Sequence, residues 1–179
     1  MTSTSVENPT ASAIALHFRA AQPHDGAHLW RLARATGTLE VNSAYFYLLF
    51  ASDFADTCLV AEHEGQVVGM VIGYRPPTDP RAAFVWQIGL LPEYQGLGLG
   101  PQLLDHWFEL PAFSACAFVT ATVADDNPAS QSLFRRFARA HGVACEETSR
   151  FTVDMFPHEH PSEPQFRIGP IRRGVSPRA

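Results

Sequence analysis

The residues with the clearest chemical potential form the glycine-rich stretch 95–100, which reads Gln-Gly-Leu-Gly-Leu-Gly. This stretch follows an apolar, strand-like run over 84–91 and precedes a helix-like one. Glycines let consecutive backbone N–H groups turn toward one anion, and a helix that begins there adds the positive end of its dipole. The stretch therefore predicts a cradle for a pyrophosphate.

The spacing of the glycines excludes the two most familiar phosphate loops. Gly96, Gly98 and Gly100 alternate strictly, whereas a dinucleotide fingerprint needs the order G-x-G-x-x-G. Its third glycine would fall at Pro101 or Leu103. A nucleoside-triphosphate loop needs Gly-Lys-Ser/Thr, and the chain contains no lysine. The loop must serve another kind of pyrophosphate.

Hydrophobic periodicity predicts the elements that position this loop. Ahead of it we expect a strand over 14–18, a helix that begins after Asp25 and stops at Gly37, a helix over 43–50, and a hairpin of strands over 57–62 and 67–74. Behind it we expect a helix carrying Leu103, Leu104, Trp107 and Phe108, a strand over 118–123, a helix capped by Asn127, and strands over 151–153 and 166–168. The strands over 84–90 and 118–123 should be parallel, because they flank a crossover helix.

Composition indicates one domain with a small-molecule partner. The 179 residues, 46% of them hydrophobic, suffice for one core and are too few for two ordinary domains. We expect a domain over 14–171 between flexible ends, 1–13 and 172–179. A net charge of −5 disfavours nucleic acid as the main partner. No apolar run approaches the ~18 residues of a membrane span and the first residues do not form a leader, so we expect a cytoplasmic protein without membrane contact.

The cysteines and histidines do not indicate a metal site. Cys58, Cys116 and Cys145 are odd in number and far apart, which fits neither a disulfide framework nor a zinc spacing. We expect buried, inert thiols. His158 and His160 lie beside prolines without a nearby cysteine, so a polar loop is expected there.

Gln95, Gly98 and Gly100 match the Q/R-x-x-G-x-G/A signature of the GNAT N-acetyltransferases, and the order of elements resembles that superfamily over most of the chain. The resemblance implies an α+β GNAT fold, with a mixed, mostly antiparallel sheet, flanking helices and a splayed central strand pair. It also implies acetyl-CoA as cosubstrate and a homodimer. The residues it implies for acetyl-CoA are Gln95, Gly96, Leu97, Gly98, Leu99 and Gly100 for the pyrophosphate, Ile88, Gly89 and Leu90 for the thioester oxygen, and Asn127 and Phe134 for the pantetheine arm.

Two further segments resemble the L-2,4-diaminobutyrate acetyltransferase family of ectoine biosynthesis. They are 36–45, which reads TGTLEVNSAY, and 121–130, which contains ATV and DNPAS. Shorter matches lie at 56–58, 73–77, 84–87 and 167–170. The resemblance implies acetyl transfer from acetyl-CoA to the γ-amine of L-2,4-diaminobutyrate, giving N-γ-acetyl-2,4-diaminobutyrate for later cyclisation to the osmolyte ectoine.

A diamino acid carries two ammonium groups and one carboxylate, so its pocket should offer both charge types. Glu40 could pair with an ammonium, Asn42 and Ser43 could hydrogen-bond the amino-acid head, and Tyr45 and Trp86 could form aromatic walls. These five are the candidate substrate residues, and Glu40 and Trp86 are the candidate catalytic residues. The alternatives are a solvated loop carboxylate for Glu40 and core packing for Tyr45 and Trp86.

Acetyl transfer needs a neutral amine, and neutralising an alkylammonium with a pKa of ~10.4 costs ~4 to 5 kcal/mol at pH 7. A carboxylate or an imidazole could take the proton, directly or through water. Glu40 would also stabilise the ammonium, so we interpret it as a binding residue with a relay role and leave the base open, with His158 and Glu159 as weaker candidates. Phe134 stands where many GNAT enzymes carry a tyrosine that protonates the thiolate, and it has no proton to give.

Two alternatives remain open from the sequence. A GNAT enzyme for another small amine or for a protein N-terminus is the nearer one; a peptide substrate would call for an open groove, whereas diaminobutyrate predicts a closed aromatic pocket formed by 40–47 and Trp86. A non-catalytic acyl-CoA sensor would keep the glycine loop without turnover. Release of CoA thiol in the presence of an amine separates the sensor from the enzymes.

Overall fold

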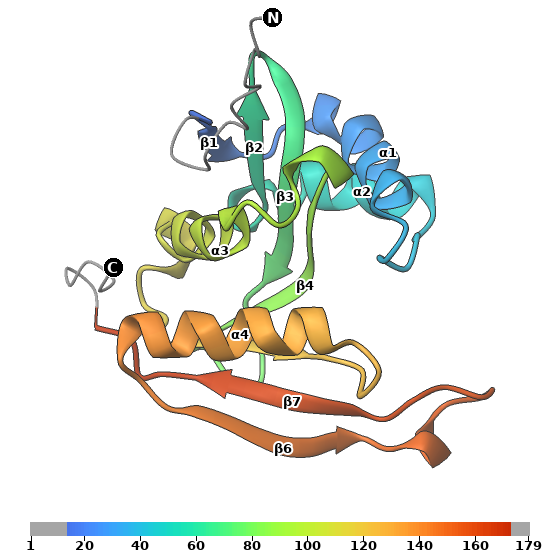
Figure 1. Cartoon of the computed structure of the whole chain (residues 1–179), viewed down its shortest axis with the longest axis vertical. Helices are drawn as coiled ribbons and strands as arrows, with labels where there is room; N and C mark the ends of the chain where they lie inside the picture. The colour runs from blue at the N-terminus through green and yellow to red at the C-terminus, as the bar shows by residue number, and fades with distance from the viewer. Residues whose placement is uncertain (1–13, 173–179) are drawn as a thin grey trace, which may run out of the picture.

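The computed structural model describes residues 14–172, and within them one mixed sheet forms the centre of the fold (Figure 1). Its strands are β1 (His17–Ala20), β2 (Leu59–His63), β3 (Gln66–Tyr74), β4 (Ala82–Leu90), β5 (Phe118–Thr122), β6 (Cys145–Phe151) and β7 (Glu163–Ile168). Their spatial order is β1-β2-β3-β4-β5-β7-β6. The β4–β5 pair is parallel and the other neighbouring pairs are antiparallel. The predicted mixed, mostly antiparallel sheet is confirmed. The predicted flexible ends 1–13 and 172–179 lie outside the described residues, except for Arg172.

Helices cover both faces of this sheet (Figure 1). They are α1 (Gly26–Thr36), α2 (Ala44–Ser52), α3 (Leu99–Phe108) and α4 (Pro128–His141). Leu29 of α1 and Tyr47 of α2 pack with Ile72 of β3 in one core cluster. Trp107 of α3 packs with Val71, the neighbour of Ile72, in the other cluster. Because successive strand side chains point to opposite faces, β3 supplies both cores and separates the two helical layers. No helix within 14–172 is long and apolar enough to cross a membrane.

Local signals fix the ends of the helices that lead into loops. Gly37 ends α1 in the left-handed conformation, with φ +66°, as its sequence position predicted. The side-chain oxygen of Asn127 accepts the N–H of Ser130 at 3.1 Å and caps α4, also as predicted. Ser43 caps α2 by accepting the N–H of Phe46 at 3.2 Å. These caps hold the starts of α2 and α4 beside the loops that reach the centre of the molecule.

Two strand predictions differ from the structure. The first strand is β1, which begins at His17 and ends at Ala20, so the predicted range 14–18 is two to three residues early. Of the predicted strand over 151–153 only Phe151 lies in a strand, because β6 covers Cys145–Phe151 and Val153–Met155 form a 3-10 turn. Most side chains of β6 are exposed at the edge of the sheet. An edge strand of this kind lacks the apolar alternation from which strands are predicted.

The two parallel strands separate halfway along β4. Their paired residues extend only as far as Val85 and Ala121, while β4 continues to Leu90 and β5 ends at Thr122. The predicted splay of the central strands is therefore present. Beyond Val85 one edge of β4 has no neighbouring strand, which opens a space inside the sheet.

Candidate active site

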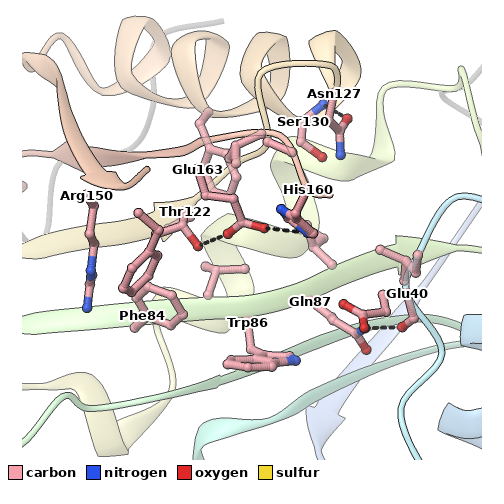
Figure 2. Close-up of a pocket in the computed structure, with 18 of the residues that line it drawn as sticks. Glu40, Phe84, Trp86, Gln87, Thr122, Asn127, Ser130, Arg150, His160 and Glu163 are labelled. Carbon is pink, nitrogen blue, oxygen red and sulfur yellow. Dashed lines mark hydrogen bonds and ion pairs between the residues drawn. The ribbon is translucent and has the colours of Figure 1, made fainter. Parts of the chain in front are cut away.

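A cavity of about 780 Å³ occupies the space between the separating strands (Figure 2). The β4 side chains in its lining are those of Phe84, Val85, Trp86, Gln87 and Ile88, and β5 and the loop behind it contribute Ala121, Thr122, Val123 and Ala124. The start of α4 adds Asn127, Ser130 and Phe134. The cavity thus follows directly from the splay, and its remaining walls come from two connecting segments.

A bulge in β4 places Trp86 at the centre of this cavity (Figure 2). The register with β3 passes from Val85 to Gln87 and skips Trp86, which makes it the extra residue. Its ring centroid lies 5.9 Å from that of Phe46 in α2, and the side chain remains 48% exposed. The bulge therefore gives an aromatic surface to the open space instead of to the core.

One side of the cavity is the inner wall, which we define as residues 38–40 together with Gln87. The Gln87 side-chain amide donates to the carbonyl oxygen of Glu40 at 2.6 Å. The hydroxyl of Tyr47 donates to Gln87 at 3.1 Å and accepts the N–H of Asn42 at 3.4 Å. Tyr47 and Gln87 are both buried. The loop that carries Glu40 is thus fastened from the protein interior.

The opposite side is the outer wall, formed by the end of β6 and the connection from β6 to β7. Its lining residues are Arg150, Phe151, Met155, Phe156, His158, His160 and Glu163. The hydroxyl of Thr122 donates to Glu163 at 2.7 Å, which joins this wall to β5. His160 Nδ1 donates to the carbonyl of Pro161 at 2.7 Å, and His160 Nε2 lies 3.9 Å from the other Glu163 oxygen. In the neutral ring Nε2 is therefore the nitrogen that can accept a proton.

The glycine loop has the backbone that an anion site requires. Gly96 and Gly98 have φ values of +73° and +74°, the left-handed region that favours glycine. Gly98 is the N-cap of α3 and provides no side-chain cap for its first turn. The Gln95 side chain donates to the carbonyl of Leu90 at 2.9 Å and closes the loop onto the end of β4. The N-terminus of α3 is consequently left for a ligand at the end of the splayed strand.

The structure brings some of the predicted site residues into the cavity and leaves others outside its lining. Glu40, Trp86, Ile88, Asn127 and Phe134 line it. Asn42, Ser43, Tyr45, Gly89, Leu90 and the glycine-loop residues 95–100 do not. The Ser43 hydroxyl serves as the α2 cap, and Tyr45 is 71% exposed. A Cβ added at Gly89 would lie 2.9 Å from Leu39, so this glycine lets the inner-wall loop rest on β4. The aromatic pocket expected from 40–47 is instead built from Trp86 and the outer wall.

Metal ligation and thiol chemistry find no support in the described part of the chain. Within 14–172 no group of three or more His, Cys, Asp or Glu side chains is placed to hold a metal ion. Cys58 and Cys116 are buried, Cys145 is partly buried, and none of the three forms a disulfide within 14–172. Burial raises the pKa of the Cys58 thiol to about 12, which keeps it protonated and unreactive.

Comparison with known proteins identifies the family. The model of the acetyltransferase (GNAT) family matches residues 26–138. The L-2,4-diaminobutyric acid acetyltransferase of Shouchella clausii is 41% identical over 149 residues, 83% of each chain, and that of Nocardia farcinica is 38% identical over 158 residues, 88% of this chain and 82% of the relative. The chain belongs to the L-2,4-diaminobutyric acid acetyltransferase family. It is therefore an acetyltransferase of the GNAT superfamily.

A solved structure of the same family has the same fold over nearly its whole length. The diaminobutyrate acetyltransferase of Paenibacillus lautus, in complex with its substrate L-2,4-diaminobutyric acid and coenzyme A, superposes with a TM-score of 0.83 at 33% identity. The match covers 91% of this chain and 99% of that one. The arrangement of strands around the cavity is thus one that a diaminobutyrate acetyltransferase uses.

In this family member, sequence reasoning missed Gln87 and most of the outer wall. Gln87 did carry a signal, because a polar residue within the apolar run 84–90 needs hydrogen-bond partners once it is buried. Of the two base candidates near the C-terminus, His158 lines the cavity and Glu159 does not. His160 was considered only as a metal ligand, and Arg150 and Glu163 were not considered. Their approach depends on the pairing of β6 with β7, for which the sequence offers no local signal.

Proposed function

We propose that this protein transfers the acetyl group of acetyl-CoA to the γ-amine of L-2,4-diaminobutyrate, giving N-γ-acetyl-2,4-diaminobutyrate for the synthesis of ectoine. The observation that carries the proposal is the cavity in the β4–β5 splay, which reaches along β4 as far as Ile88 and has acidic, basic and aromatic walls. The fold shared with a relative that binds diaminobutyrate and coenzyme A supports it.

The glycine loop beyond the end of β4 suits the CoA half of the donor. Backbone N–H groups of 95–100 would hold the pyrophosphate at the start of α3, because glycine conformations and the absence of a side-chain cap leave this helix end open to an anion. Asn127 and Phe134 line the cavity at the start of α4 and would border the pantetheine arm. The thioester is thereby directed into the splay.

The free edge of β4 suits the developing oxyanion. When the amine nitrogen forms its bond to the thioester carbon, an electron pair moves to the carbonyl oxygen and then returns as the C–S bond breaks. The edge of Ile88, Gly89 and Leu90 opposite β3 has no strand partner. An N–H group on this edge would stabilise the negative oxygen. The bonded nitrogen loses its extra proton to solvent as the amide forms. CoA leaves as a thiolate and takes a proton from solvent, because Phe134 supplies none.

The two walls suit the acceptor amine. Trp86 offers its ring to an ammonium group, and Glu40 supplies the opposite charge in our proposal. Loss of the γ-ammonium proton makes the nitrogen nucleophilic, and an imidazole or carboxylate on the outer wall would accept that proton, directly or through water. His160 and Glu163 are the candidates for this base in our proposal. A hydrogen bond to the carbonyl of Pro161 holds His160, and one from the hydroxyl of Thr122 holds Glu163.

The test is release of CoA thiol from acetyl-CoA with L-2,4-diaminobutyrate, beside ornithine, lysine and a short peptide, with NMR to locate the acetyl group. We expect a strong preference for diaminobutyrate and acetylation at Nγ. Activity only on another amine would preserve the acetyltransferase and overturn its substrate. The absence of release with every acceptor would favour an acyl-CoA sensor.

The proposal extends to organisation in the cell. We propose one catalytic domain over 14–171, a cytoplasmic location and a homodimer, without nucleic-acid or membrane partners. The exposed apolar side chains of Tyr45, Leu48, Val153 and Met155 support self-association, because a second chain could cover one such group. Light scattering on the eluting protein measures the assembly, and a monomer mass at micromolar concentration would overturn the homodimer.

A further inference from the structure

The cavity contains a guanidinium group that the steps described above do not use. Among the described residues that line it, Arg150 at the end of β6 is the only arginine. Arg19, Arg135 and Arg167 pair with carboxylates elsewhere in the described part of the chain, whereas Arg150 forms no such pair. A permanent positive charge therefore faces the cavity without a carboxylate from the described protein beside it.

Aromatic rings hold this charge at the cavity wall. The guanidinium carbon of Arg150 lies 5.6 Å from the ring centre of Phe84 and 5.0 Å from that of Phe151. Both rings line the cavity, and Phe84 is buried. Arg150 is an exposed residue, and cation–π contacts restrict its side chain without neutralising it. The planar fork of an arginine matches the two oxygens of a carboxylate.

The position of Arg150 excludes the pyrophosphate of CoA as this anion. Arg150 lies beside Phe84, near the first residues of β4, while the glycine loop follows the last residue, Leu90. Six strand residues separate the two places by about 20 Å. Figure 2 shows Arg150 and Glu40 at opposite sides of the view, with Trp86 between them. The anion at Arg150 must therefore belong to the acceptor end of the site.

We propose that Arg150 binds the α-carboxylate of the acceptor amino acid and thereby selects both the substrate and the nitrogen that reacts. This inference rests on the proposed function. With the carboxylate held at the Arg150 end, the α-amine stays close to that end because it shares a carbon with the carboxylate. The γ-amine extends away from Arg150 toward Trp86 and the thioester. Arg150 is then the residue that distinguishes a diamino acid from a diamine.

The experiment compares L-2,4-diaminobutyrate with propane-1,3-diamine, which is the same molecule without its carboxylate. Wild type, Arg150→Ala and Arg150→Lys are assayed for CoA-thiol release with both acceptors. Arg136→Ala is the matched control, because it removes an exposed arginine from α4 and lies outside the cavity lining. If the diamine is acetylated too slowly for its kcat/KM to be measured, its inhibition constant in the diaminobutyrate assay is compared between variants instead. NMR of the diaminobutyrate product gives the ratio of α- to γ-acetylation.

We expect Arg150→Ala to lower kcat/KM for diaminobutyrate about 10- to 100-fold, the loss typical of one charge-assisted pair, and to leave the diamine within about twofold. Arg150→Lys should recover part of the loss, and the α-acetylated share should rise in Arg150→Ala. Equal losses with both acceptors, or no loss with either, would overturn the role of Arg150. If the wild-type protein did not acetylate diaminobutyrate, the proposed function would be overturned. The same assay thus distinguishes failure of the proposed function from failure of the role of Arg150.

Discussion

The inner and outer walls of the cavity are held in different ways. Hydrogen bonds from Gln87 and Tyr47 hold the inner wall, and both of these side chains are buried. The outer wall extends from β6, an edge strand that pairs only with β7 and exposes most of its side chains. Buried hydrogen bonds raise the free energy of local opening, and an exposed edge lowers it. Changes to the hydrogen bonds that hold the inner wall should therefore alter stability and acceptor binding together, whereas outer-wall changes should alter binding alone.

The largest effect is expected from a change that touches neither wall. Gly98→Trp places a bulky side chain at a left-handed position in the glycine loop, where it would fill the anion cradle. The KM for acetyl-CoA should rise more than about 100-fold, because the pyrophosphate contacts are lost together. Gly65→Trp is the matched control, since Gly65 has φ +78° in the β2–β3 turn, outside the glycine loop and the cavity lining. Unchanged acetyl-CoA affinity in Gly98→Trp would move the cradle elsewhere.

The next largest effect is on stability and concerns the ion pair at the start of α1, the helix whose other end leads into the inner wall. Arg19 of β1 donates to both oxygens of buried Asp25, at 2.6 and 2.9 Å, and to Glu62 of β2 at 2.6 Å. Arg19→Met leaves Asp25 without its counter-charge, which should lower the free energy of unfolding at pH 7 by about 3 kcal/mol. Urea unfolding measures this loss, with Arg139→Met on the exposed side of α4 as the control.

The same pair should make stability depend on acid. Burial by itself would raise the pKa of Asp25, but hydrogen bonds from Arg19 and from the Gln22 backbone outweigh it and lower that pKa. A lowered folded-state pKa stabilises the protein above the unfolded value of ~3.9, and the stabilisation disappears as pH falls through the folded-state value. The difference between wild type and Arg19→Met should therefore shrink as pH falls below the unfolded value of ~3.9. A difference that stays constant from pH 7 into this acid range would contradict the assignment.

Gln87→Leu tests directly whether the inner wall couples stability to binding. It removes the donor to Glu40 and leaves the buried Tyr47 hydroxyl without its acceptor. We expect a loss of about 2 kcal/mol in the free energy of unfolding and a rise of about tenfold in the KM for diaminobutyrate, with the KM for acetyl-CoA unchanged. Glu40→Ala is the comparison variant, because it removes the exposed carboxylate and leaves the loop backbone fastened. It should raise the same KM without the loss of stability.

Equal effects of Glu40→Ala on the two KM values would assign Glu40 a structural role. A Gln87→Leu protein that loses stability but keeps its diaminobutyrate KM would show that the inner wall does not position the acceptor. Tyr47→Phe separates the two hydrogen bonds, since it keeps the buried ring and deletes only the hydroxyl. It should fall between wild type and Gln87→Leu in both measurements.

The sequence predicted those parts of the fold in which a residue type meets a local demand of the backbone. Gly37 ends α1, Asn127 begins α4, and Gly96 and Gly98 adopt positive φ values in the loop that their spacing indicated. Each of these signals acts over a few residues and needs no distant partner. The strand at β6 has no comparable signal, because its exposed side chains follow neither periodicity nor a turn motif.

In the site too, the sequence predicted the residues that lie in recognisable local segments. Trp86 and Glu40 lie in segments whose sequence resembles a known family, and both line the cavity. Arg150 and Glu163 face the cavity because β6 pairs with β7 and β7 with β5, a register that long-range packing decides. The bulge that directs Trp86 into the cavity likewise depends on how β3 pairs with β4. Local sequence patterns therefore do not predict residues whose role depends on how the strands pair.

The smallest effect on stability and binding is expected from a change in the exposed outer wall. Met155 lines the cavity from the outer wall and is 63% exposed. Met155→Ser should change the free energy of unfolding by less than about 0.5 kcal/mol, as for other exposed positions, and the diaminobutyrate KM by no more than about threefold. Urea unfolding at two protein concentrations measures the first quantity and excludes a contribution from association. A larger loss that grows on dilution would mean that a second chain covers Met155, and the outer wall would then owe its rigidity to the dimer and not to β7.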